Sequence, residues 1–411
     1  MLKKKILISL LALSMFTGIS SNAYAAKHEE LYNLATQQKT QYLTELEKYV
    51  NIDSGSTYEK GLKEYQEILI NRLKDLGAQV AYKEVKKPQA GYNIQATFTG
   101  QGKGSVLMLI HADTVFAAGT AAQRPFKVEG NYAYGPGVSD AKGGMVLALN
   151  SVELLNKINF KDYGKLTILI NPDEERSSLE SRDFIKEVAK THQYTLCFEP
   201  GIHGDKVMNW RKGIGRLTME VKGRNAHAGI APQDGRNATV ELAHQILQLR
   251  NLGDSKKMTT VNWTLLDKTK TPVNVIPDYA WAQADVRLMY NDEYERIMKD
   301  AQKIVAKNLI PETSVNLSMF QGRPPFTKND KTDKMIAIMQ NIYKEELGRE
   351  LGVEGSGGGS DANYAAIVGS TAMDGLGPVG YRDHAPDEHI DLETVVPRMY
   401  LTARIIMELG K

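Results

Sequence analysis

Runs of consecutive apolar residues alternate with amphipathic segments over the first half of the chain. Uninterrupted apolar runs at 105–113, 165–171 and 194–198 predict buried strands. Apolar residues at helical spacing predict helices within 31–76 and at 141–157 and 178–191, with Gly77 ending the first stretch and Ser177 and Glu180 forming a capping box for the last. Buried strands that alternate with helices are typical of a mostly parallel sheet covered by helices on both faces.

The pattern changes after residue 213. Alternation at 216–223 predicts a half-exposed strand. A helix (238–251), two strands (258–266 and 279–289), a helix (293–308) and a strand (314–320) follow. This β-α-β-β-α-β order is the ferredoxin-like unit. Because helices resume at 334–347, we expect one α/β catalytic domain in two pieces, 26–213 and 323–411, with a lid or dimerisation domain inserted at 214–322.

The first 25 residues have the three parts of a secretory signal peptide. Lysines 3–5 precede an apolar stretch at 6–16, and Ala23 and Ala25 form a small-residue cleavage site. The alternative is an N-terminal membrane anchor, for which the apolar stretch is short. Since no later stretch is long and apolar enough to cross a bilayer, we expect a periplasmic or secreted protein without a membrane span in the mature chain.

Charge and cysteine content narrow the function classes. The formal net charge falls from +2 to −1 when the signal is removed, because the signal holds three lysines and no acid. A nearly neutral chain without a basic stripe argues against nucleic-acid binding. Cys197 is the only cysteine, so no intrachain disulfide forms. An exported protein of this kind relies on a large core or on bound metal.

Metal-binding residue types recur directly after the predicted strands or before helices. They are His111, Asp113, Asp140, Glu174, Glu175, Glu199 and His384. Ligands of parallel sheets bind beyond the carboxyl ends of the strands, so these side chains should meet at one edge. Each one alone is explained as a cap or a structural residue, but together they suit zinc or a similar divalent ion. His203, close to Glu199, is an alternative ligand.

Six segments resemble a known family in their order along the chain. "HADTV", "GPGVSDAKGGM", "NPDEE", "FEP", "NAHAG" and "DHAPDE" resemble the M20 metallopeptidases, and within them the glutamate carboxypeptidases of the folate-cleaving (glucarpidase) type. The resemblance extends over essentially the whole mature chain. It is weaker at 201–212, and Arg176 to Ser178 also depart from the family pattern, which bears on glutamate specificity rather than on metal chemistry.

The resemblance implies two zinc ions per subunit that share one carboxylate. One ion would be held by His111, Asp140 and Glu199, and the other by Asp140, Glu175 and His384. Asp113 would orient His111, and a cis peptide would follow Asp140. A hydroxide bridging the two ions would attack the scissile carbonyl. Glu174 would act as general base and then return the proton to the leaving amine.

The resemblance also implies residues beyond the metal site. His227 would stabilise the oxyanion from the partner subunit of a homodimer. Arg323, Arg287 and Asn274 would contact a substrate with a C-terminal carboxylate. The glycine-rich stretch 355–366 lacks the lysine and spacing of a phosphate loop, and we expect the backbone around Gly358 to meet a substrate carboxylate instead.

The predicted function is a zinc-dependent exopeptidase that releases C-terminal glutamate from N-acyl or folate-like substrates. An aminoacylase, a dipeptidase or another M20 amidohydrolase with different side-chain specificity is the alternative among hydrolases. A non-catalytic periplasmic binding protein is the alternative from another class. Its sequence would have lost the base or the ligands, whereas Glu174 and all five ligand positions are present here.

Overall fold

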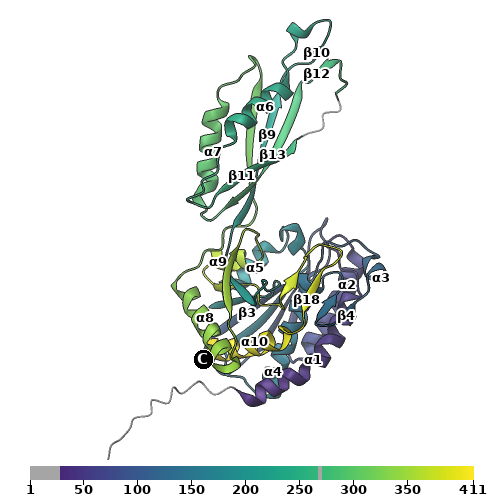
Figure 1. The fold of residues 1–411 in the computed structure, drawn as a ribbon, viewed down its shortest axis with the longest axis vertical. Coiled ribbons are helices and arrows are strands. Elements are labelled where there is room, and N and C mark those ends of the chain that lie inside the picture. Colours follow the sequence, from purple (N-terminus) through teal and green to yellow (C-terminus); the bar gives the residue numbers. More distant parts are fainter. Residues whose placement is uncertain (1–27, 267–270) are drawn as a thin grey trace, which may run out of the picture.

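The computed structural model describes residues 28–266 and 271–411, which form two bodies stacked along the long axis of the molecule (Figure 1). The larger body holds both ends of the described chain, and the smaller one is built from the segment between the start of β9 and the end of β14, residues 213–321. The signal peptide expected at 1–25 lies outside the described residues. Within those residues, no helix combines the length and apolarity that a membrane crossing requires.

A six-stranded sheet forms the centre of the larger body. Its strands, in spatial order, are β1 (Gln79–Glu84), β2 (Tyr92–Thr99), β6 (Lys165–Asn171), β3 (Ser105–His111), β7 (Tyr194–Cys197) and β16 (Thr371–Met373). The last four are mutually parallel, whereas β2 runs antiparallel to both β1 and β6. The predicted mostly parallel sheet is therefore confirmed, with an antiparallel hairpin at one edge. Because β3 lies between β6 and β7, its carboxyl end opens at the middle of the sheet.

Helices bury both faces of this sheet. Val106, Met108 and Ile110 of β3 face a core that includes helices α1 (Glu29–Val50), α2 (Glu59–Asp75), α4 (Gly144–Lys157), α8 (Asp330–Asn341) and α10 (Val395–Leu409). The alternate residues Leu107 and Leu109 face α5 (Arg182–Ala189) and α9 (Ala362–Ile367). Successive side chains of a strand point to opposite faces, so an uninterrupted apolar run indicates a strand buried on both sides.

The smaller body has the predicted ferredoxin-like order. Strands β9 (Gly213–Lys222), β11 (Thr260–Leu266), β13 (Tyr279–Leu288) and β14 (Ser314–Gln321) form an antiparallel sheet in the order β11-β13-β9-β14. Helices α6 (Ala238–Leu249) and α7 (Asp292–Val305) share one separate hydrophobic core with this sheet. The chain passes between the bodies where β9 begins and where β14 ends.

Shorter elements complete the fold. The helical ones are α3 (Thr120–Gln123), the π-helix Ile342–Glu346 and the 3-10 helices Glu174–Arg176 and Pro232–Asp234, and Val138–Gly143 is a kinked turn with non-helical backbone angles at Asp140 and Ala141. Strands β4 (Lys127–Glu129), β5 (Tyr132–Tyr134), β17 (Gly380–Tyr381) and β18 (His389–Asp391) form an antiparallel sheet. Two pairs remain, the parallel pair β8 (Lys206–Arg211) and β15 (Gly352–Ser356) and the antiparallel pair β10 (Ala226–His227) and β12 (Val275–Ile276).

The capping box expected at the start of α5 is wrong. The helix begins at Arg182, and Ser177 has a φ of +65° at the end of the preceding 3-10 turn. Asp173 organises this loop instead, because its carboxylate accepts hydrogen bonds from the Glu180 N–H (2.9 Å) and the Ser181 hydroxyl. The prediction failed because a buried acid reaches across the loop, a contact that local spacing does not reveal.

Candidate metal centre and active site

The side chains expected to meet at one sheet edge do so. They line or underlie a cavity of about 820 Å³ that opens at the carboxyl ends of β6, β3 and β7. His111 ends β3, Glu175 follows β6, and Glu199 follows β7. Asp140 comes from the turn before α4, and His384 comes from the loop between β17 and β18. The fold thus collects these residues from five separate segments of the chain.

The first ligand-like group contains His111, Asp140 and Glu199. His111 Nε2 lies 2.9 Å from Asp140 Oδ1 and 3.8 Å from Glu199 Oε1. The other ring nitrogen, Nδ1, lies 3.0 Å from the Asp113 carbonyl and 3.4 Å from its carboxylate. A partner at Nδ1 fixes the orientation of the ring, so Nε2 is the atom presented to the group.

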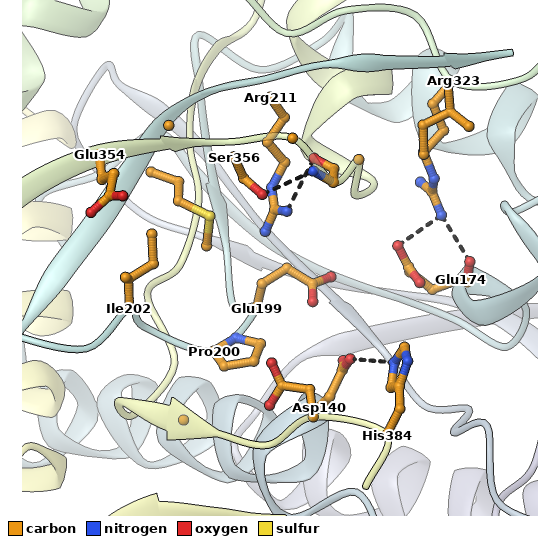
Figure 2. A pocket seen from close by; sticks show the side chains of 18 of the residues that line it. Asp140, Glu174, Glu199, Pro200, Ile202, Arg211, Arg323, Glu354, Ser356 and His384 are labelled. Atoms are coloured by element: carbon orange, nitrogen blue, oxygen red, sulfur yellow. Dashed lines mark hydrogen bonds and ion pairs between the residues drawn. The ribbon is translucent and has the colours of Figure 1, made fainter. Parts of the chain in front are cut away.

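The second group contains Asp140, Glu175 and His384. His384 Nε2 lies 3.0 Å from Asp140 Oδ2 (Figure 2) and 3.3 Å from Glu175 Oε2. Asp140 therefore directs one carboxylate oxygen at each histidine and belongs to both groups. The peptide bond between Asp140 and Ala141 is cis, as expected from the resemblance. The groups contain the residues expected to bind zinc, and their role as ligands stays a prediction.

The donor set suits a divalent cation. In each group, one ligand atom per residue lies within 4.8 Å of the others. Glu175 Oε1 is buried and has no hydrogen-bond partner among the described residues, a costly arrangement that coordination would relieve. Hydrogen bonds from His384 to Asp140 and Glu175 raise the pKa of His384 to about 11, while burial raises the pKa of Glu175 to about 7. The raised pKa values mean that these groups hold protons between them when no cation is bound. A zinc ion can take the place of those protons, because imidazole nitrogen and carboxylate oxygen are established zinc ligands.

Glu174 belongs to neither group, although it is adjacent to Glu175. Its side-chain Oε1 and its carbonyl oxygen accept hydrogen bonds from Arg323 Nη2 at 2.7 and 2.8 Å. Burial raises the pKa of Glu174 to about 8, against the opposing charge of Arg323. Asp113 organises the turn that carries both glutamates, because its carboxylate accepts both of their backbone N–H groups at 3.0 and 3.2 Å. This second task of Asp113 was not anticipated from the sequence.

The residues expected to contact substrate fall into two places. Arg323, Arg287 and Gly358 line the cavity. Arg323 is nevertheless engaged by Glu174 and, through Nη1 at 2.5 Å, by Asp361. Arg287 pairs with Asp285 and donates to the Gly357 carbonyl at 3.2 Å. The Gly358 N–H donates to Ser356 Oγ at 3.0 Å, so this amide already has a partner.

His227 and Asn274 do not line the cavity. They lie side by side at the far tip of the smaller body, where β10 pairs with β12 and the Ala228 N–H donates to the Asn274 carbonyl at 2.8 Å (Figure 1). His227 is exposed, and its Nδ1 accepts two backbone N–H groups at 3.2 Å. The alternative ligand His203 lines the cavity but belongs to neither ligand group, and its Nδ1 contacts the Tyr381 hydroxyl at 3.0 Å.

Comparison with known proteins agrees with this geometry. The profile of the peptidase family M20/M25/M40 matches residues 107–408. The chain belongs to this family. It is 36% identical over 396 residues to Carboxypeptidase G2 from Pseudomonas sp. (strain RS-16), covering 95% of each chain. It is therefore a hydrolase of peptide bonds, and its sequence is close to that of a metal-dependent exopeptidase.

Solved structures show the same fold at low sequence identity. Aminopeptidase PepT from Bacillus cereus superposes with a TM-score of 0.77 at 22% identity, covering 91% of this chain and 99% of that one. The M20 metallo-carboxypeptidase Sso-CP2 from Sulfolobus solfataricus gives 0.72 at 18% identity, covering 90% and 99%. These likenesses extend through both bodies of the M20 chain.

Two residues of this M20 peptidase were not singled out from its sequence. Glu388 is buried behind the Asp140 turn and accepts N–H groups from Gly137, Ser139 and Asp140 at 2.8 to 3.0 Å. Its place in the "DHAPDE" segment, four residues after His384, is the signal from which it could have been found. Arg211 enters the cavity from β8, within the stretch where the family resemblance is weakest.

Proposed function

We propose that this protein is a dizinc carboxypeptidase that releases C-terminal glutamate from N-acyl or folate-like substrates, with Glu174 as general base. The observation that carries the proposal is the position of Glu174. It lies in the same cavity as two groups of zinc-type ligands, next to Glu175 of one group, yet belongs to neither. The similarity to Carboxypeptidase G2 supports the choice of a carboxypeptidase within the family.

The two ligand groups divide the chemistry with Glu174. His111, Asp140 and Glu199 would hold one zinc ion, and Asp140, Glu175 and His384 the other. Zinc bound there would polarise the scissile carbonyl and lower the pKa of the attacking water. Glu174 takes the proton of that water and returns it to the leaving amine. Asp113 keeps His111 in the tautomer with a free Nε2 and holds the Glu174 turn in place.

Cationic groups in the cavity wall favour an anionic substrate. Arg211, Arg287 and Arg323 line the same cavity, and arginine matches a carboxylate with two parallel hydrogen bonds. Arg323 lies beside the base, so a substrate carboxylate bound to it would replace Glu174 as its partner and release the base for catalysis. The backbone around Gly358 and the side chain of Arg287 would complete this end of the cavity.

A homodimer would bring His227 and Asn274 of one subunit to the cavity of the other. His227 and Asn274 lie together but outside the cavity of their own chain, which supports action on the cavity of a partner subunit. The smaller body also exposes apolar side chains on its outer strand and helix, Leu265 and Leu266 on β11 and Leu247 on α6. Exposed apolar side chains on an edge strand favour pairing with a second copy.

We further propose the domain division 26–213 and 323–411 for catalysis, with 214–322 as lid and dimerisation domain. Export would follow removal of the signal peptide 1–25, leaving a periplasmic or secreted enzyme. The intact mass of the protein recovered from the periplasm or medium tests this. A mass equal to that of residues 26–411 is expected, and a full-length product in the membrane fraction would refute it.

A panel of N-acyl amino acids, assayed with zinc and with a chelator, tests the function. Release of glutamate should exceed release of neutral amino acids by at least tenfold, and chelation should abolish it. Equal release of all residues would favour an aminoacylase or other M20 amidohydrolase instead. Cleavage of dipeptides with a free amino group would favour a dipeptidase. Binding without hydrolysis of any substrate would favour a binding protein.

A further inference from the structure

Arg211 is a buried arginine that projects into the cavity, and the proposed function assigns it no particular group of the substrate. It stands at the end of β8, where Ser356 of β15 is its neighbour in the parallel pair. Only 7% of the residue is exposed. Figure 2 shows its guanidinium above Glu199, pointing into the cavity at some remove from the pair formed by Arg323 and Glu174.

The side chain is anchored along one edge. Its Nε donates to Asp374 Oδ2 at 2.5 Å. Asp374 is fully buried and is itself held by the Ser360 hydroxyl and by the Gly375 N–H. The Arg211 backbone exchanges hydrogen bonds with Phe326 in both directions, at 2.9 and 3.0 Å. A cation held this firmly presents its remaining donors in a defined direction at little further entropic cost.

The other edge of the guanidinium has donors to spare. Nη1 reaches only the Gly358 carbonyl, at the long distance of 3.4 Å, and Nη2 has no hydrogen-bond partner among the described residues. In Arg323, by contrast, both terminal nitrogens are taken by Asp361 and Glu174. An arginine fork with its outer edge open toward a cavity matches a carboxylate or another planar anion.

The chemistry of the reaction separates the two arginines. The α-carbon of the C-terminal residue is bonded to the nitrogen that receives the proton from Glu174. The α-carboxylate of the substrate should therefore lie near Glu174, where Arg323 is placed to bind it. Arg211 lies at a distance from this pair and can bind a second carboxylate, at the end of the side chain of the same substrate residue. Every C-terminal residue carries the first carboxylate, whereas only acidic residues carry the second.

We propose that Arg211 binds the side-chain carboxylate of the C-terminal residue and so makes this enzyme discriminate glutamate from glutamine. This inference rests on the proposed carboxypeptidase function. Arg211 lies within 201–212, where the chain departs most from the family pattern, so the selectivity is a property of this sequence. The Asp374 anchor makes Arg211 a rigid receptor, and its open edge selects an anion.

The experiment compares an N-acyl-glutamate with the matching N-acyl-glutamine in the zinc-loaded enzyme and in Arg211→Gln. For the wild type, kcat/KM should favour glutamate strongly. In the variant, kcat/KM for glutamate should fall about tenfold to a hundredfold, the effect of losing a charge-assisted hydrogen bond, mainly through KM. The rate on the glutamine substrate should stay within about threefold. Arg349→Gln is the matched control, because Arg349 also pairs with an aspartate, Asp205, but does not line the cavity.

The outcomes separate this inference from the proposed function. Loss on both substrates by the same factor, with reduced zinc content, would mean that Arg211 supports Glu199 and would overturn the inference. An unchanged ratio between the substrates would also overturn it while leaving the carboxypeptidase intact. No release of any C-terminal residue by the wild type would refute the proposed function itself. If Arg211→Gln fails to fold, Arg211→Lys keeps a charge beside Asp374 but loses the fork, and the same substrate ratio should still fall.

Discussion

The two adjacent glutamates should respond differently to the same substitution. In Glu174→Gln, the amide oxygen can still accept the 2.7 Å hydrogen bond from Arg323. Only the negative charge that strengthens this bond is lost, which should cost about 1–2 kcal/mol of unfolding free energy. Both ligand groups stay complete, and we expect two zinc ions per subunit. The proton acceptor is lost, so kcat should fall by about 10²–10⁴-fold.

In Glu175→Gln, the second group loses an anionic ligand. Glu175 Oε2 lies 3.3 Å from His384 Nε2, and Oε1 has no other partner to keep the side chain in place. Neutral amide oxygen is a weaker zinc ligand than carboxylate, so this variant should retain about one zinc per subunit. Metal analysis after gel filtration, together with kcat on an N-acyl-glutamate, measures both effects. Equal zinc loss in the two variants, or full turnover in Glu174→Gln, would refute the division of labour.

Three further predictions concern other parts of the chain. Glu388→Ala leaves three backbone N–H groups, two of them buried, without an acceptor, and should cost about 2–5 kcal/mol in unfolding free energy, with weaker zinc loading. Glu388→Gln keeps an acceptor and should cost less, so equal costs would contradict the assignment. Burial lowers the pKa of His192 to about 4 in the folded chain, below its ordinary value in the unfolded chain. The unfolded chain therefore binds a proton at His192 before the folded chain does as the pH falls. The metal-free protein should lose about 2 kcal/mol of unfolding free energy between pH 6.5 and 4. Urea unfolding at both pH values should show this loss reduced in His192→Asn, whereas an unchanged loss would rule out His192 as its source. Mixing inactive Glu174→Gln with inactive His227→Ala subunits should restore part of the turnover if His227 acts across a dimer, and a mixture that exchanges subunits yet stays inactive would exclude this.

The pattern of apolar residues was sufficient for the buried parts of the fold. The strand expected at 165–171 is β6 with identical bounds, because an apolar run buried on both faces has few alternatives. The alternating and helical segments of the smaller body also follow the predicted order. Strand β1 was missed because its side chains are almost all exposed and carry little periodic signal. Its partner β2 was overlooked although Ile94, Ala96 and Phe98 alternate as buried apolar residues. The helix-rich stretch expected at 31–76 consists of two helices, α1 and α2.

The residues of the candidate site were also readable along the chain. Histidines and carboxylates placed directly after apolar strands predict a metal site, because parallel strands end at one edge of a sheet. The resemblance then paired them into the two groups that the fold brings together. Local sequence was enough to find these side chains because each one lies within a short distance of a strand or helix end.

Tertiary structure alone decided which partner each buried charge has. Arg323 meets Glu174 across 149 residues, and Glu388 meets Gly137 across 251 residues. Arg211 is aimed by Asp374, 163 residues away. A charge buried in the fold must find a counter-charge or donor wherever the chain happens to pass, and that path depends on the packing of the whole domain. The sequence therefore determines which chemical groups are present, and the packed fold determines which of them contact one another.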